Sequence, residues 1–360
     1  MTNPPSDFPV VLAANNGDIA GGEVMLLAVA EALRDLGMEP LVVGMDTPAG
    51  LVETARNRGF TAEALRVRSR IEYMHVLRRW RKEHPEGVLW CNGLVPATAT
   101  SGMSRRIVHL HQVPAGPQRA AVTVARLGAM ATVVPSEFMA SRISGARVLH
   151  NWSPALERVV VPRGKGPLRL GFLGRPSEAK GVHILADAIT LLRRTGQAKY
   201  FLRVAGEPRF VDARERAVVE NRLRRLSGSV QQLGWMVPDE FFGTIDILVV
   251  PSLWEEPFGL VVTEAMSAKV PVVVSDAGAL PEVVGPDHPW IARAGDPRSL
   301  ADAIAAAAAA LPARDVVERA HTRWAERFSP VVGREALREL LSSLGLLPEG
   351  TAAPKAEAAT

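Results

Sequence analysis

The sequence contains a single cysteine, Cys91, and lacks several features that tie a chain to a special environment. One cysteine excludes an internal disulfide and fits a reducing cytoplasm. No uninterrupted apolar stretch approaches the roughly 20 residues that span a bilayer. The N-terminus has neither a basic n-region nor a long apolar h-region, so we expect no signal peptide.

Three other signals are missing. The 42 Lys and Arg residues against 38 Asp and Glu leave a net charge of only +4, which gives no global case for nucleic-acid binding. The first glycine-rich turn, residues 15–23, does not have G-x-G-x-x-G spacing, so a dinucleotide site is disfavoured. No Asp-x-Asp motif follows a predicted strand, and we expect neither a metal site nor a cofactor.

The chain has instead the length and composition of a two-domain globular protein. Its 360 residues are too many for one ordinary core, and 47% hydrophobic with 22% charged residues is typical of soluble proteins. Short buried strands alternate with helical patterns from residue 8 onward. This order predicts an α/β fold with parallel sheets.

One stretch, residues 251–284, organises the second half of the chain. It reads PSLWEEPFGLVVTEAMSAKVPVVVSDAGALPEVV and follows a β-branched apolar run at residues 245–250. We predict a strand there, a helix over residues 258–268 and a second strand at residues 271–274. Parallel sheets bind ligands outside the carboxyl ends of their strands, which places a ligand at the loop around Glu255 and Glu256.

Two carboxylates in this stretch have a useful spacing. Glu264 lies about two helical turns beyond Glu256. The free N–H groups at the start of the helix can face an anion, and the two carboxylates can accept hydrogen bonds from hydroxyls on either side of it. Sugar and ribose hydroxyls fit that role. The alternative is that Glu256 is an acid favoured by the helix dipole and that Glu264 is a solvated helical residue.

The whole stretch resembles the donor-site signature of retaining family-4 glycosyltransferases of the GT-B fold. The resemblance implies two Rossmann-like domains whose parallel sheets face a central cleft. It also implies that Glu256 contacts the donor sugar and that Glu264 contacts the ribose. The helix start at Phe258, Gly259 and Leu260 would bind the rest of the donor.

Further positions of the family pattern occur in the second half of the chain. The family places an Arg directly after the first strand of this domain and a Lys five residues later, as a phosphate clamp. Arg175 and Lys180 match both positions, and their charges would replace a metal ion. Trp235 matches the residue beside the nucleobase. As isolated residues, the two cations would read as surface charges.

Two positions of the first half also match. Gly21 and Gly22 correspond to a Gly-Gly turn that meets the donor phosphates or the acceptor, although the same residues suit a tight βα turn. His111 corresponds to a histidine that touches the donor sugar. His109 lies on the same side of its strand, so the choice between the two histidines stays open.

The most basic segment is residues 65–83. Its cations are interleaved with apolar residues: Arg66, Arg68, Arg70, Arg78, Arg79, Arg81 and Lys82. Two interpretations stay open, a solvated arginine-rich face over a core-facing stripe and a weak contact with an anionic membrane surface. We therefore expect a cytoplasmic protein, peripheral at the inner membrane face in the second interpretation.

The resemblance gives the expected domain organisation. Residues 1–152 form an N-terminal, acceptor-side Rossmann-like domain, and residues 153–330 form the nucleotide-sugar-binding domain. A C-terminal helix, residues 331–347, packs back on the first domain. The tail, residues 348–360, is low-complexity and should be disordered.

The expected activity is metal-independent, retaining transfer of a hexose-type sugar from a nucleotide-diphosphate donor to an acceptor hydroxyl. The acceptor is a saccharide, glycolipid or small molecule. Alternatives are a GT-B-fold epimerase or phosphorylase, or a silent nucleotide-sugar-binding subunit. One departure from the family, Lys269 in place of Gly, gives a local prediction. The chain must reverse there before Pro271, so Lys269 should have φ > 0.

Overall fold

The computed structural model describes residues 10–162, 164–195, 199–208 and 211–347. The predicted tail at residues 348–360 lies outside the described residues. The chain divides into two units. Unit 1 contains residues 10–135, Ile143–Leu149 and 330–347, and unit 2 contains Ser136–Arg142 and His150–Ser329. Residues 136–142 thus group with unit 2, although the sequence assigned them to the first domain.

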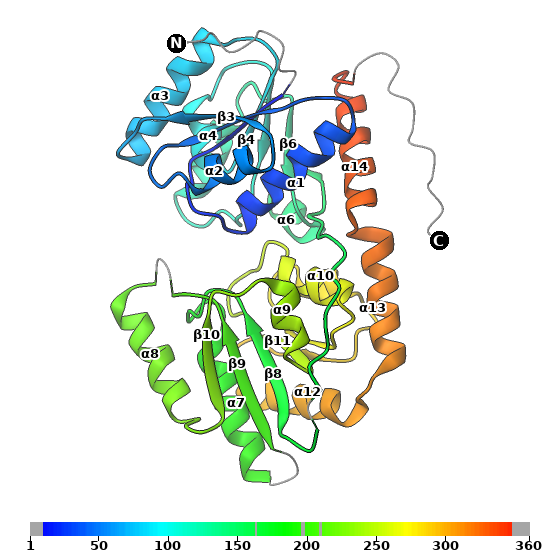
Figure 1. Ribbon diagram of the computed structural model, residues 1–360. Coiled ribbons are helices and arrows are strands. Elements are labelled where there is room, and N and C mark those ends of the chain that lie inside the picture. Colours follow the sequence, from blue (N-terminus) through cyan, green and yellow to red (C-terminus); the bar gives the residue numbers. More distant parts are fainter. Residues whose placement is uncertain (1–9, 163, 196–198, 209–210, 348–360) are drawn as a thin grey trace. The chain divides into compact units, whose positions relative to one another are not determined.

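Unit 1 is built on a parallel sheet with the strand order β3-β2-β1-β4-β5-β6-β7 in the described part of the chain (Figure 1). Its central strands are apolar and fully buried, as expected for strands covered on both faces. The strands are β1 (Val10–Ala14), β2 (Leu41–Met45), β3 (Thr61–Leu65), β4 (Val88–Asn92), β5 (Arg106–His109), β6 (Ala131–Val134) and β7 (Arg147–Val148).

Helices connect these strands and pack on the sheet. The last helix of the chain, α14, packs against α1, and Arg334 Nη1 lies 2.6 Å from Asp35 Oδ2 between them. The helices of unit 1 are α1 (Gly21–Asp35), α2 (Gly50–Asn57), α3 (Arg70–Glu83), α4 (Leu94–Ala99), α5 (Gln118–Ala125) and α14 (Pro330–Ser343).

Helix α3 corrects part of the interpretation of the basic segment. Arg81 is buried rather than surface-exposed, and its guanidinium donates hydrogen bonds to the carbonyl oxygens of His84, Glu86 and Gly87. These carbonyls belong to the turn after the helix, so Arg81 closes the end of α3. Arg78 donates to the carbonyls of Ala99 and Ser101.

Unit 2 repeats the design with the strand order β10-β9-β8-β11-β12-β13 in its described residues. All pairings between these strands in the described residues are parallel. The strands are β8 (Leu168–Leu173), β9 (Tyr200–Ala205), β10 (Val230–Gly234), β11 (Ile247–Val250), β12 (Val272–Ser275) and β13 (Ile291–Ala292).

Alternating side chains of these strands enter two separate cores. Ile247 and Val249 of β11 join one cluster, which contains α7, α8 and α12, while Leu248 and Val250 join the other, which contains α9, α10 and α11. The sheet is therefore covered on both faces. The helices of unit 2 are α6 (Glu137–Arg142), α7 (Val182–Thr195), α8 (Ala213–Arg224), α9 (Pro238–Gly243), α10 (Leu260–Ser267), α11 (Leu280–Val284), α12 (Pro297–Ala310) and α13 (Arg314–Arg327).

Two parallel α/β units confirm the predicted fold class with two Rossmann-like domains. The central cleft between them stays a prediction. Within the described residues, no helix combines the length and the apolar character needed to cross a bilayer.

Candidate functional site

The candidate site of unit 2 lies where the strand order changes direction. Strands β8 and β11 are neighbours in the sheet but are separated in sequence by β9 and β10. At such a switch point the two loops that leave the strands diverge and make room for a ligand. The loop after β8 contains Arg175 and Lys180, and the loop after β11 contains Glu256.

The structure brings Lys180 and Glu256 together. Lys180 Nζ lies 2.6 Å from Glu256 Oε1, and Ser252 Oγ donates to the same oxygen over 2.6 Å. Glu256 is only 4% exposed. The Lys180 ammonium also lies 5.2 Å from the centre of the Trp254 ring, a cation–π distance. A buried carboxylate with two donors at hydrogen-bond distance has a fixed orientation.

Backbone contacts fix the loop around Glu256. Leu253 N donates to Ala179 O, which ties the loop to the one after β8, and Ala279 N donates to Glu256 O. Gly278 has a φ of 61°, and a Cβ there would overlap the backbone of Glu256. Only glycine permits this close approach. Glu256 is thus held from both neighbouring loops.

Glu264 lies near the middle of α10, the helix that follows this loop. Burial, with a smaller contribution from Asp239, raises the pKa of its carboxyl to about 7. The carboxyl is therefore partly protonated at neutral pH and can both donate and accept hydrogen bonds. That combination suits a pair of ribose hydroxyls.

The remaining predicted residues of unit 2 differ in exposure. Arg175 is exposed directly after β8, and Trp235 is 70% exposed after β10. Phe258 is buried, and its ring lies 5.4 Å from that of Phe328 within the core. Its contribution to a ligand site is therefore its backbone N–H. Leu260 begins α10 after the N-cap Gly259.

The switch point of unit 1 lies between β1 and β4 and has a neutral site. His111 Nε2 lies 2.6 Å from Asn92 Oδ1, and Asn92 Nδ2 donates to Gly22 O over 3.1 Å. Because the Asn92 amide nitrogen faces a carbonyl, its oxygen accepts from the His111 Nε2–H. His111 Nδ1 then carries a lone pair. Burial lowers the pKa of His111 to about 4, so the ring is neutral.

His109 and His111 have different surroundings. His109 is fully buried, with its ring 5.5 Å from Trp90 and 4.0 Å from His111. Within the described residues, neither ring nitrogen of His109 has a hydrogen-bond partner. The ring of His109 packs against the ring of His111. His111 is the more accessible of the two.

The sequence interpretation missed Asn16 of the β1–α1 turn and Glu23 of α1. Glu23 is buried and accepts hydrogen bonds from Asn16 Nδ2 at 3.0 Å and Ala20 N at 3.2 Å. Burial raises the pKa of Glu23 to about 7. An acid three residues after the N-cap is a capping-box signal, which identifies it as a helix-start residue that also orders the turn before Gly21 and Gly22.

The predicted strain at Lys269 is confirmed. Its φ is 53°, in the left-handed region, directly after α10 and before Pro271. Its ammonium pairs with the Glu318 carboxylate at 3.0 Å, with both side chains largely exposed.

Comparison with known proteins bears on the same residues. Residues 167–309 match the family described as glycosyl transferases group 1. The match covers β8 to α12 and includes Arg175, Lys180, Glu256 and Glu264. It confirms the glycosyltransferase resemblance of residues 251–284.

Among curated proteins, the chain is 29% identical over 235 residues to a glycogen synthase of Mycobacterium tuberculosis, covering 64% of this chain and 46% of that protein. The chain spans less than half the length of the first curated relatives that it matches.

Solved structures match over almost the whole chain. HepE of Anabaena, in complex with UDP-glucose, has a TM-score of 0.79 at 21% identity and covers 93% of this chain and 99% of that one. A sucrose-phosphate synthase of Thermosynechococcus elongatus has a TM-score of 0.78 at 17% identity, covering 94% and 99%. Likeness at this level of identity shows the shared fold.

Proposed function

With residues 167–309 forming a glycosyl transferases group 1 domain of the GT-B type, we propose that the chain is a retaining glycosyltransferase. It moves a hexose-type sugar from a nucleotide-diphosphate donor to an acceptor hydroxyl. The observation that carries the proposal is the 2.6 Å pair of Lys180 and Glu256 at the switch point of unit 2. One cation for a phosphate and one oriented carboxylate for a sugar are the two groups that donor binding needs.

Binding rearranges the partners of Lys180. The diphosphate offers its ammonium several anionic oxygens, and Arg175 adds a second cation from the same loop. Glu256 keeps its bond from Ser252 and is free to accept from a sugar hydroxyl. The helix-start amides at Phe258, Gly259 and Leu260 add further N–H donors to the anion.

The chemical step then needs little from the protein beyond charge. The bond between the anomeric carbon and the leaving phosphate oxygen breaks as the acceptor oxygen attacks from the same face. The acceptor proton passes to that leaving oxygen. Arg175 and Lys180 stabilise the negative charge that builds up on the diphosphate, in place of a metal ion. Because the acceptor enters on the side from which the phosphate leaves, the configuration is retained.

Unit 1 supplies neutral groups. The lone pair on His111 Nδ1 accepts a hydrogen bond from a hydroxyl of the donor sugar. Gly22, whose carbonyl orients Asn92, and Gly21 form the start of α1, which borders the acceptor. Trp235, exposed at the end of β10, stacks on or borders the nucleobase.

The alternatives make different predictions for the same assay. A GT-B-fold epimerase would change the sugar of the donor without an acceptor, and a phosphorylase would need inorganic phosphate. A silent nucleotide-sugar-binding subunit would release no nucleotide at all.

The test is a panel of nucleotide sugars incubated with the protein, with and without saccharide acceptors. UDP-glucose comes first, because HepE binds it. We expect slow release of the nucleoside diphosphate from one donor, acceleration by an acceptor, and no loss of activity with EDTA. Proton NMR of the product should show the anomeric configuration of the donor. Inversion, or turnover that requires inorganic phosphate, would reject the proposal.

We also propose that exposed cations around α3 make a weak contact with anionic lipid, which would place the protein in the cytoplasm at the inner membrane face. Six cations support it by their exposure, namely Arg66, Arg68, Arg70, Arg78, Arg79 and Lys82. Each basic residue near such a surface contributes about 1 kcal/mol. Cosedimentation with phosphatidylserine vesicles, lost at high salt and absent with phosphatidylcholine, is expected. Equal recovery with both lipids would contradict the membrane contact and favour the interpretation of a solvated arginine-rich face.

A further inference from the structure

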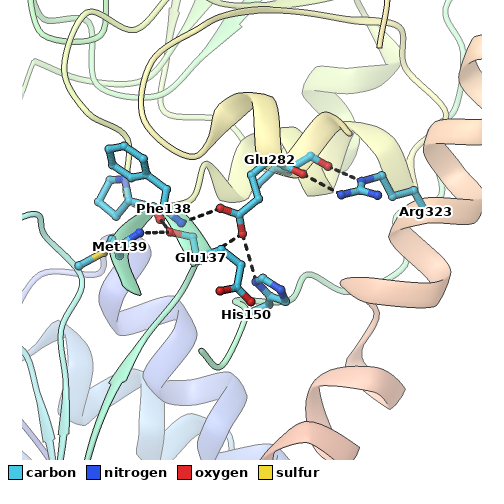
Figure 2. Close-up of polar contacts among 9 residues, drawn as sticks. Glu137, Phe138, Met139, His150, Glu282 and Arg323 are labelled. Atoms are coloured by element: carbon cyan, nitrogen blue, oxygen red, sulfur yellow. Dashed lines mark hydrogen bonds and ion pairs between the residues drawn. The ribbon is translucent and has the colours of Figure 1, made fainter. Parts of the chain in front are cut away.

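The short helix α6 is attached to the rest of unit 2 by the carboxylate of Glu282, a residue of the stretch 251–284. Glu282 of α11 accepts hydrogen bonds from the backbone N–H groups of Glu137 at 2.9 Å and Phe138 at 2.8 Å (Figure 2). These are first-turn amides of α6, which have no partner within the helix. A carboxylate that accepts two such amides is a strong, charge-assisted cap.

Glu282 is itself held from two sides. Arg323 of α13 donates to the carbonyl oxygens of Glu282 and Val283, at 2.8 and 2.9 Å. His150 Nδ1 lies 3.9 Å from the Glu282 carboxylate. Figure 2 shows the Glu282 carboxylate between the start of α6 and His150, with Arg323 on the backbone side. The cap therefore has a fixed position in unit 2.

Ser136, the residue before α6, connects this helix to the loop at residues 255–257. Ser136 Oγ donates to Pro257 O over 2.6 Å and accepts from Met139 N over 3.1 Å. Ser136 is completely buried. Pro257 has no N–H, so its carbonyl is the hydrogen-bonding group of its backbone. That carbonyl lies between Glu256 and Phe258, the residues proposed to contact the sugar and the phosphate.

A second contact joins the far end of α6 to the same loop. Arg142 Nη2 lies 2.6 Å from Glu255 Oε1, and both side chains are 49% exposed. An exposed pair of this kind contributes little to stability. It nevertheless shows that both ends of α6 meet the loop at residues 255–257.

We propose that α6 acts as a brace for the donor loop, and that Ser136 and Glu282 are positioning residues for Glu256. Neither touches the donor. Glu282 fixes the start of α6, Ser136 fixes the carbonyl of Pro257, and Glu256 is held as the preceding residue. The inference rests on the proposed function only for the identity of the reaction. The contacts themselves hold the loop whichever ligand it binds.

The test compares three serine variants. Ser136→Ala removes the donor to Pro257 O, and Ser136→Thr keeps it. Ser141→Ala is the matched control, because Ser141 Oγ donates to Phe138 O within α6 and contacts no other element in doing so. For Ser136→Ala we expect kcat to fall about tenfold while KM for the donor changes less. The variant loses one buried hydrogen bond, and we expect that loss to raise the energy of the transition state more than that of the bound donor. Ser136→Thr should recover most of kcat.

Glu282 is tested in the same assay. Glu282→Ala should lower kcat as Ser136→Ala does, while Glu282→Gln, which keeps an oxygen acceptor, should lower it less. The proposal is overturned if Ser136→Ala and Ser141→Ala have the same kcat and KM and differ from the wild type only in melting temperature.

A measurement without substrate separates this proposal from the proposed function. Hydrogen exchange of a peptide covering residues 255–260 should be faster in Ser136→Ala than in wild type and in Ser141→Ala. If the wild-type protein turns over no nucleotide sugar, the proposed function fails while faster exchange still supports the brace. Unchanged exchange in Ser136→Ala refutes the brace, whatever the activity.

Discussion

Units 1 and 2 share one scaffold but present opposite chemistry at equivalent places. In each, the first strand lies between its second strand and a strand that follows later in the chain. At the switch point of unit 2, the partly exposed ammonium of Lys180 forms an ion pair with the buried carboxylate of Glu256. At that of unit 1, burial keeps His111 neutral, with a pKa of about 4, and raises the pKa of Glu23 to about 7.

The two units thus share the position of a candidate site, at the end of their first strand, and differ in the strand-end loops that supply its side chains. An ion pair can be opened by a diphosphate, which supplies its own charge to the cation. Neutral groups cannot offset a charge, but they bind hydroxyls by directional hydrogen bonds. The charged groups of unit 2 therefore suit a phosphate, and the neutral groups of unit 1 suit hydroxyls.

The largest expected effect concerns Glu264, the one strongly perturbed acid of the α10 helix in unit 2. Its pKa is raised from 4.5 to about 7, so the folded state is most favoured below pH 4.5 and loses this stability as the pH rises to 7. Glu264→Gln should therefore stabilise unit 2 at pH 8, by up to about 3 kcal/mol, and not at pH 4.5. Calorimetric melting at pH 5, 6.5 and 8 measures it.

The control for that experiment is Glu240→Gln, an exposed acid of the neighbouring helix α9. Its melting temperature should follow the wild type at every pH. Parallel curves for Glu264→Gln and wild type would mean that Glu264 is not buried as described.

The second prediction removes the cation of unit 2. Lys180→Ala should lower kcat/KM for the donor by about tenfold or more, since a hydrogen bond to a charged group contributes roughly 1.5–3 kcal/mol. Both donor binding and turnover should suffer, because the phosphate is charged in the ground state and gains charge as the bond breaks. The matched control is Lys199→Ala, because Lys199 is an exposed lysine just before β9. Equal kcat/KM values in the two variants would show that Lys180 does not bind the donor.

The third prediction adds a negative charge to the neutral site of unit 1, which makes it more like the charged site of unit 2. Asn92→Asp places a carboxylate where the Asn92 Oδ1 atom lies 2.6 Å from His111 Nε2. A close opposite charge raises a histidine pKa by about 1–3 units, so the pKa of His111 should move up from about 4. Nuclear magnetic resonance titration of the ring measures the shift. Asn92→Ser, which adds no charge, should leave the pKa lower than in Asn92→Asp.

The smallest effect is expected at Lys269. Its left-handed backbone, φ 53°, costs on the order of 1 kcal/mol more for Lys than for Gly, so Lys269→Gly should raise the melting temperature slightly. The loss of the exposed pair with Glu318 offsets part of this gain. Lys269→Ala keeps the strain and loses the pair, so it should be less stable than Lys269→Gly. Donor affinity should not change in either variant.

The buried strands and the signature loop could be predicted because their information is local. β-branched apolar runs next to Pro predicted β11 and β12 to within a few residues. The edge strand β3, with the sequence Thr-Ala-Glu-Ala-Leu, was missed because Ala and Glu are rare in strands and the strand is only partly buried. The strain at Lys269 was predictable because the next strand begins within two residues.

Contacts between distant segments could not be predicted. The amide of Glu137 meets the carboxylate of Glu282, 145 residues further along the chain. Nothing in the local pattern of residues 136–142 shows that they group with unit 2. The sequence interpretation placed Arg81 on an exposed basic face for the same reason. Its carbonyl partners are brought together only by the turn after α3.

The path of the chain through the two units limits how the protein can be divided. The chain passes between them four times, after Pro135, Arg142, Leu149 and Ser329. A fragment that starts at His150 would contain the whole sheet of unit 2 and all of the matched family segment. It would nevertheless expose the Glu282 carboxylate and the Pro257 carbonyl, whose partners lie in residues 136–138. A fragment meant to bind a nucleotide sugar by itself should therefore begin at Ser136 and carry the crossing at residues 143–149 as a loop.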